Sequence, residues 1–229
     1  MEYTVKFHDQ LVMNIKPSIQ GWMWPEHDNM FQWFADEIPK YVSGYLQYCR
    51  QFKVAVQAGG HSGVFPRILS TLFETVYTFE PDGYSFHCLV NNCNLDTIKK
   101  FNCALGGTHD MLYQKYRGQY NMGVNNYGLP IEGEDPITLV RDVVNSDEPA
   151  LVNIPQIRID DLGLENCDLI HLDVEGYEGN VIDGATQTIE KFKPLLLWES
   201  MPQKTVEYLQ TLGYHHVQFA SSGDTMYRV

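Results

Sequence analysis

Residues 54–65 read Val54-Ala55-Val56-Gln57-Ala58-Gly59-Gly60-His61-Ser62-Gly63-Val64-Phe65. A run of strand-forming residues ends at Ala58, a glycine-rich stretch follows, and an apolar run resumes at Val64. This order predicts a buried strand, a tight turn and the start of a helix. Glycines let the backbone turn sharply and approach a ligand closely, and a helix N-terminus offers unpaired N–H groups. The stretch therefore indicates either a nucleotide-cofactor loop or a plain junction between a strand and a helix.

A second signal favours the cofactor loop. Seventeen residues after Gly63, the run Val76-Tyr77-Thr78-Phe79-Glu80-Pro81-Asp82 predicts another buried strand that ends in an acid, Glu80. In a parallel sheet this carboxylate comes to the tip of the neighbouring strand, where it can accept both hydroxyls of a nucleotide ribose. The alternative is a glutamate that faces solvent in a turn.

From about Lys53 onward, short apolar runs alternate with longer amphipathic stretches, which is typical of an α/β fold with a mainly parallel sheet. We predict strands at Lys53–Ala58, Thr75–Glu80, Ile98–Leu105, Asp168–Val174, Pro194–Glu199, Tyr214–Ala220 and Thr225–Val229. We predict helices at Val64–Phe73, Tyr84–Asn92, Tyr177–Phe192 and Gln203–Leu212.

A third signal is the stretch Asp168-Leu169-Ile170-His171-Leu172-Asp173-Val174-Glu175-Gly176-Tyr177-Glu178. Side chains alternate along a strand, so His171 and Asp173 share one face near its carboxyl end, where ligands bind in open α/β sheets. We predict that both face a reacting group. The alternative is that His171 is hydrogen-bonded within the core and that Asp173 caps the following helix.

These segments together resemble one known family. The order AGGHSG, FEPD, NCALG, IDDL, LIHLDVEGYEGNVIDGA and KPLLLWE, across roughly residues 53–200, is similar to the FkbM-type methyltransferases. The resemblance implies a Rossmann-like sheet of seven strands, mostly parallel with an antiparallel last strand, and helices on both faces. It also implies S-adenosylmethionine as cofactor and methylation of an oxygen, often on a sugar or polyketide.

The resemblance also assigns site residues. Asn102, Ala104 and Leu105 match the segment near the adenine, and Asp173, Glu175 and Gly176 match the block beneath the transferable methyl. Gln57 departs from the family, which usually has an acid there that contacts the methionine amino group, and His61 stands where an asparagine is frequent. The full set predicted to bind cofactor is Gln57, Gly59, Gly60, His61, Ser62, Gly63, Glu80, Pro81, Asp82, Asn102, Ala104, Leu105 and Asp173.

Two regions fall outside the alternating pattern. Residues 1–52 are expected to form an N-terminal helical extension, with a helix at 29–49, that covers the acceptor site or simply packs on the sheet. Residues 53–229 then form the methyltransferase domain, with an insertion at about 106–155 that resembles a lid or binding loop. Aromatic residues in both regions could line a sugar site or pack the core: Trp22, Trp24, Tyr113, Tyr116, Tyr120 and Tyr127.

Composition disfavours one class of partner. The chain of 229 residues has 16 Lys and Arg against 29 Asp and Glu, a net charge of −13, which disfavours nucleic acid as a partner. We expect a small-molecule or glycan acceptor. No secretion signal or membrane-spanning run is recognisable, and five cysteines without paired spacing fit a cytoplasmic protein.

For the chemistry, we expect Asp173 to act as general base, with His171 second and Glu199 as a further candidate. We expect no required metal, although His171, Asp173 and Glu199 together offer part of a ligand set. A dinucleotide-dependent oxidoreductase would share the glycine turn and the acid, but not the Asp-Val-Glu-Gly block. A non-catalytic module that binds S-adenosylmethionine or a nucleotide stays open as the alternative, because of Gln57.

Overall fold

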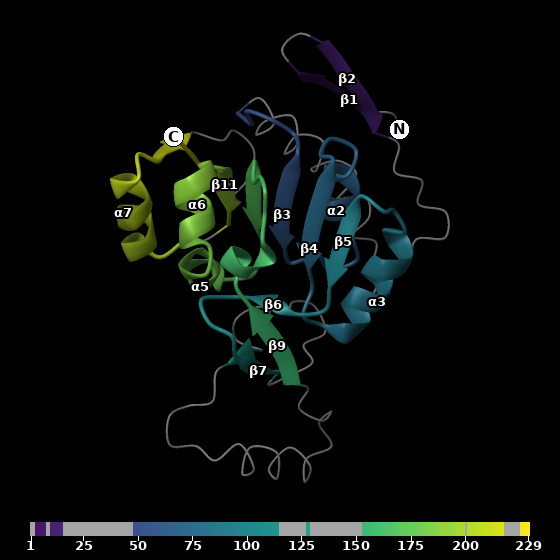
Figure 1. Ribbon diagram of the computed structural model, residues 1–229. Helices are drawn as coiled ribbons and strands as arrows, with labels where there is room; N and C mark the ends of the chain where they lie inside the picture. The colour runs from purple at the N-terminus through teal and green to yellow at the C-terminus, as the bar shows by residue number, and fades with distance from the viewer. Residues whose placement is uncertain are drawn as a thin grey trace, which may run out of the picture.

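A seven-stranded sheet forms the centre of the computed structural model (Figure 1), which describes residues 3–7, 10–15, 48–114, 127–128, 153–199, 201–217 and 225–229. Its strands are β3 (Val54–Ala58), β4 (Thr75–Phe79), β5 (Ile98–Phe101), β10 (Leu169–Leu172), β11 (Leu195–Trp198), β12 (His215–Val217) and β13 (Thr225–Arg228). Their order is β12-β13-β11-β10-β3-β4-β5. The strands from β11 to β5 are parallel, whereas β13 runs antiparallel to both β11 and β12. The predicted sheet, with its antiparallel last strand, is confirmed.

Helices cover both faces of this sheet, as predicted. They are α2 (Val64–Leu69), α3 (Gly83–Asn92), α5 (Glu178–Asp183), α6 (Thr186–Phe192) and α7 (Gln203–Thr211). Alternate residues of each strand supply two apolar clusters: Ala55 and Leu169 pack with Leu69 of α2, while Val56 and Ile170 pack with Ile189 of α6. The period of two in the strands therefore gives each face of the sheet its own core.

Two predicted elements are each divided in the structure. The single helix expected at Tyr177–Phe192 becomes α5 and α6, separated at Gly184. A Cβ there would come 1.9 Å from the carbonyl oxygen of Gly106, so another segment packs directly on this backbone. The strand expected at Ile98–Leu105 becomes β5 and a separate β6 (Ala104–Leu105).

The strand β6 belongs to a second, small sheet with the order β6-β9-β7-β8. Its other strands are β7 (Met111–Gln114), β8 (Tyr127–Gly128) and β9 (Asn153–Ile157), so it lies largely in the predicted insertion. Figure 1 shows it on the side to which the strand arrows of β4 and β5 point. The small sheet therefore lies at the carboxyl edge of the large sheet (Figure 1), which is the edge where α/β folds bind ligands.

The N-terminal region contains a hairpin that the sequence analysis did not anticipate. Strands β1 (Tyr3–Phe7) and β2 (Gln10–Ile15) pair antiparallel. The expected helix at 29–49 lies outside the described residues except for its last two, and so do Trp22, Trp24, Tyr116 and Tyr120. Among the helices that are described, none has the length and apolar character needed to cross a bilayer.

Candidate functional site

The glycine-rich loop between β3 and α2 is held by backbone hydrogen bonds to the next strand. The N–H groups of Gly59 and Gly60 both donate to the carbonyl oxygen of Phe79 at 3.0 Å. Gly59 has a φ of +82°, and a Cβ on it would come 1.9 Å from the carbonyl oxygen of Asp173. A side chain at residue 59 would therefore push apart the ends of β3 and β10, which explains the glycine in physical terms.

Glu80 lies directly against this loop. One oxygen of its carboxylate accepts the N–H of His61 at 2.7 Å, and the other accepts the N–H of Asp82 at 2.8 Å. The side chain is 5% exposed, and burial raises its pKa to about 7, with Asp82 and Asp173 adding to the increase and the two N–H donors opposing it. Each carboxylate oxygen has a second acceptor position. Glu80 can therefore accept further hydrogen bonds from a ligand at the loop.

The other predicted cofactor residues lie around this centre in different ways. Asn102 donates to the carbonyl oxygens of Glu80 at 2.9 Å and Pro81 at 3.1 Å, so it belongs to the same group. The hydroxyl of Ser62 is buried and makes no hydrogen bond within the described part of the chain. Leu105 is buried in the core cluster beneath the sheet, so a packing role accounts for it.

Gln57 lies beneath the loop. Its carboxamide nitrogen donates to the carbonyl oxygens of Ala58 at 3.0 Å and Gly59 at 2.9 Å, and its oxygen accepts the hydroxyl of Thr78 at 2.6 Å. Gln57 and Thr78 are both completely buried. The side chain therefore binds the loop that it precedes. Nothing in the sequence indicated Thr78.

Three acids gather at the carboxyl ends of β10 and β11. One carboxylate oxygen from each acid lies within 4.8 Å of the other two, and the acids are Asp173, Glu175 and Glu199. Glu199 is exposed, and the other two are half-buried. Such a group can take up a proton or offer oxygen ligands to a hard divalent cation, although exposed acids commonly gather without one. Glu175 was predicted only as part of the family block, and its φ is +54°.

His171 lies apart from these acids. Its imidazole is 2% exposed and stands edge-on to the ring of Phe65, with ring centroids 4.6 Å apart. Burial lowers its pKa to about 4, so the imidazole is neutral at physiological pH. The structure thus places His171 inside the α2 face of the core, whereas Asp173 lies beyond the end of the strand.

Glu178, at the start of α5, shapes the loop that carries these acids. It is completely buried, and its carboxylate accepts the N–H of Val174 at 3.4 Å. Burial raises its pKa, and backbone N–H groups of the same loop, including that of Gly176, oppose the increase. The loop therefore wraps around the side chain of Glu178. This role was not predicted from the sequence, although an acid in the first turn of a helix is a usable signal for it.

The small sheet is bound to the same loop through Gln156 of β9. Its side-chain oxygen accepts the hydroxyl of Tyr177 at 2.8 Å, and its nitrogen donates to the carbonyl and hydroxyl oxygens of Thr108, both at 3.0 Å. A Cβ on Gly106 would lie 2.3 Å from this carboxamide. The insertion and the acidic loop are therefore held in one arrangement.

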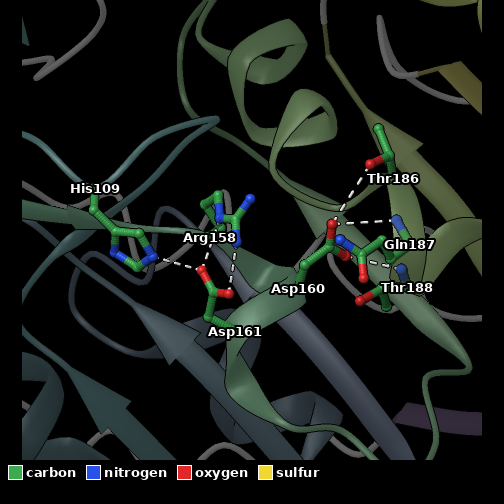
Figure 2. Close-up of polar contacts among 7 residues, drawn as sticks. All are labelled: His109, Arg158, Asp160, Asp161, Thr186, Gln187 and Thr188. Atoms are coloured by element: carbon green, nitrogen blue, oxygen red, sulfur yellow. Dashed lines mark hydrogen bonds and ion pairs between the residues drawn. The ribbon is translucent and has the colours of Figure 1, made fainter.

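Two neighbouring acids on the short helix that follows β9 reinforce this arrangement (Figure 2). Asp161 forms a bidentate pair with Arg158, at 2.7 Å to each nitrogen, and contacts His109 at 2.6 Å. The hydrogen bonds from Arg158 are the main reason why the pKa of Asp161 is lowered to about 2. Asp160 points the other way and accepts the N–H groups of Gln187 at 3.1 Å and Thr188 at 2.8 Å. Asp160 thus caps α6, whose own N-cap residue makes no side-chain hydrogen bond.

Residues 58–219, more than half of the chain, match the methyltransferase FkbM domain family. No curated protein matches the chain.

Among solved structures, the fold is similar to methyltransferase FkbM from Methylobacillus flagellatus KT, with 15% identity and a TM-score of 0.51. The match covers 90% of this chain and 56% of that one, so this chain spans little more than half of that protein's length. Precorrin-6y C5,15-methyltransferase from Geobacter metallireducens GS-15 matches with 12% identity, a TM-score of 0.42 and coverage of 83% and 85%. Precorrin 8w decarboxylase from Methanobacterium thermoautotrophicum matches with 13% identity, a TM-score of 0.43 and coverage of 85% and 90%. None of these similarities assigns a substrate.

Proposed function

Because this chain belongs to the FkbM methyltransferase family, we propose that it transfers a methyl group from S-adenosylmethionine to a hydroxyl of a sugar or another small metabolite. The observation that carries the proposal is the carboxylate of Glu80, bound to the glycine-rich loop through the N–H of His61. This pairing combines an acceptor for two ribose hydroxyls with a loop that admits a ligand close to its backbone.

The residues present fit such a cofactor. The loop around Gly59, Gly60 and Gly63 follows the carboxyl end of β3, and Glu80 follows the end of the adjacent β4. We assign the ribose to Glu80, the adenine to the segment that begins at Asn102, and the methionine side to the ends of β3 and β10. Ser62 and Leu105 are buried, and Leu105 packs in the core cluster that contains Val56 and Ile170.

When bound, the cofactor would supply an activated methyl group, whose bond to sulfur would be replaced by a bond to the acceptor oxygen, with S-adenosylhomocysteine as the leaving group. An acceptor hydroxyl must also lose its proton, and a carboxylate within hydrogen-bond reach can take it. We assign this role to Asp173, with Glu199 as the second acid beside it and Glu175 as the third member of the group. His171 stays neutral in the core and positions the end of β10. The mechanism uses no metal.

Charge and shape favour a small acceptor over a polyanion. The chain carries 16 basic against 29 acidic residues, and the acids at the ends of β10 and β11 would repel a phosphate backbone. The small sheet is joined to the acidic loop through the hydrogen bond between Gln156 and Tyr177. We therefore place acceptor selection in the insertion and propose a cytoplasmic enzyme that acts on glycans or small hydroxyl compounds.

The test is a methyl-transfer assay with labelled S-adenosylmethionine that offers glycans, small hydroxyl compounds, nucleotides, RNA and DNA at two salt concentrations. We expect transfer to a glycan or small hydroxyl compound at both. Methylation of RNA or DNA alone, collapsing at the higher salt, would overturn the acceptor assignment. A second candidate is a module that binds the cofactor without turnover, because Gln57 stands where the family resemblance implies an acid. Calorimetric binding of S-adenosylhomocysteine with no transfer to any acceptor would support that candidate.

A further inference from the structure

Gln57 stands just before the glycine-rich loop, at the position where the family resemblance implies an acid. Gln57 lies in a row of three polar side chains across the sheet, in register with His171 on β10 and Thr78 on β4. All three are almost completely buried on the face that packs against α2. A buried carboxamide needs partners for its oxygen and both N–H groups, so its hydrogen bonds determine its role.

Gln57 makes three hydrogen bonds to neighbouring groups of the chain. Its nitrogen donates to two successive carbonyl oxygens, of Ala58 and Gly59, at the point where β3 passes into the loop. Its oxygen accepts the hydroxyl of Thr78 at 2.6 Å. A Cβ on Gly60 would lie 2.7 Å from the oxygen of that hydroxyl, so Thr78 also packs directly against the loop. Thr78 and Gln57 together hold the underside of the loop.

A cofactor ammonium group donates hydrogen bonds and therefore needs an acceptor. The only acceptor in the Gln57 side chain is its oxygen, which is buried against Thr78. The carbonyl of Ala58 already accepts the N–H of Asp173 at 3.1 Å in addition to the Gln57 amide. Residue 57 thus presents no charge and no accessible acceptor to the methionine side of the site.

We infer that Gln57 is a positioning residue that fixes the cofactor loop through the carbonyls of Ala58 and Gly59 and makes no contact with the cofactor's ammonium group. This inference rests on the proposed function. A glutamate at this position, which has the same shape as glutamine, would place one ionised carboxylate oxygen against these two carbonyl oxygens and would therefore disturb this loop arrangement.

The test compares two probes by calorimetry: S-adenosylhomocysteine, which carries the ammonium group, and 5′-methylthioadenosine, which lacks the whole amino-acid part. In Gln57→Glu and in Gln57→Met, which keeps the volume but not the hydrogen bonds, we expect both probes to weaken by the same factor, about tenfold or more. Thr78→Val should weaken both equally, by several-fold. Gln210→Glu, the same exchange at an exposed position of α7, is the matched control and should change neither affinity.

A pH profile separates positioning from general loss of stability. The glutamate in Gln57→Glu is buried, so its pKa is raised, and its protonated form can again donate to a carbonyl oxygen. We compare the affinity of Gln57→Glu with that of the wild type at each pH. For both probes this ratio should therefore recover as the pH falls. The wild type, in which Glu80, Asp173 and His171 are the titratable groups on the neighbouring strands or at their ends, is measured at the same pH values as the reference.

The opposite pattern would overturn the inference. If residue 57 contacts the ammonium group, Gln57→Glu strengthens S-adenosylhomocysteine alone, and Gln57→Met weakens that probe while 5′-methylthioadenosine binds as before. A Gln57→Glu variant that does not fold leaves the Gln57→Met and Thr78→Val comparisons to decide. Failure of the proposed function has a different signature, since the wild-type chain would then bind neither probe.

Discussion

Replacing Glu80 by glutamine changes one atom of the site and should weaken cofactor binding in a defined way. The carboxylate accepts one backbone N–H on each oxygen, from His61 and from Asp82. The glutamine amide must turn its NH₂ toward one of these donors, so it loses that bond and the charge offered to the ribose. A hydrogen bond to a charged group contributes about 1.5–3 kcal/mol, so S-adenosylhomocysteine should bind roughly ten- to a hundred-fold more weakly.

The raised pKa of Glu80 adds a pH dependence to the same measurement. Its pKa of about 7 means that the free protein holds a proton on Glu80 below neutral pH. Ribose hydroxyls donate to the ionised carboxylate, so binding must expel this proton, and affinity should fall about tenfold between pH 8 and pH 6. In Glu80→Gln no proton is lost, and the affinity should be low but nearly constant over this range. The pKa of His61 is lowered by burial, which moves its own titration away from neutral pH.

Isothermal titration calorimetry with S-adenosylhomocysteine at pH 6, 7 and 8 measures both effects. Glu74→Gln, the same exchange at an exposed position before β4, is the matched control and should retain the wild-type affinity and its pH dependence. Wild-type affinity in Glu80→Gln at pH 8 would remove Glu80 from the site. A loss in Glu80→Gln with a wild-type pH profile would assign the proton to another group.

Asp173→Asn removes a base and keeps the shape, so it should lower the rate of methyl transfer about 10²–10⁴-fold in steady-state kinetics and change the affinity for S-adenosylhomocysteine far less. Full activity would move the role to Glu199 or show that no base is needed. Asp160→Ala should lower the unfolding free energy by about 1 kcal/mol, or about 2–4 °C in Tm by calorimetry, because α6 loses its cap; an unchanged Tm would contradict the capping role. Treatment with EDTA should leave methyl transfer unchanged, and activity that disappears and returns with Mg²⁺ would instead make the three carboxylates metal ligands.

The sequence predicts those features of the fold that depend on neighbours along the chain. Parallel strands buried on both faces read as apolar runs, so β3, β4, β10 and β11 were found to within two residues at either end. The carboxyl end of a parallel strand has a fixed place in the sheet, so the proximity of Glu80 to the glycine-rich loop also followed from the order of segments. Both inferences use local periodicity and one topological rule.

Features that depend on contacts between distant segments were not predicted. The helical pattern continues across Gly184, and only the carbonyl of Gly106, packed where a Cβ would be, explains the division into α5 and α6. Asp160 caps a helix that begins far along the chain, at Thr186, which no local capping pattern reveals. The insertion likewise joins the acidic loop through Gln156 and Tyr177, whose side chains carry no mark of this pairing in the sequence.

Gln57 shows that the identity of a residue can predict the wrong role when the hydrogen-bond partners of its side chain are unknown. A pattern comparison interprets glutamine for acid as the loss of a charge from the cofactor site, and therefore as weaker binding. The hydrogen bonds to Ala58, Gly59 and Thr78 instead bind the carboxamide to the underside of the loop and to β4. A charge at a buried position is costly unless it is paired, whereas a fully bonded amide is not. The neutral side chain therefore suits a buried support, and restoring the acid should weaken the site that the acid serves elsewhere in the family.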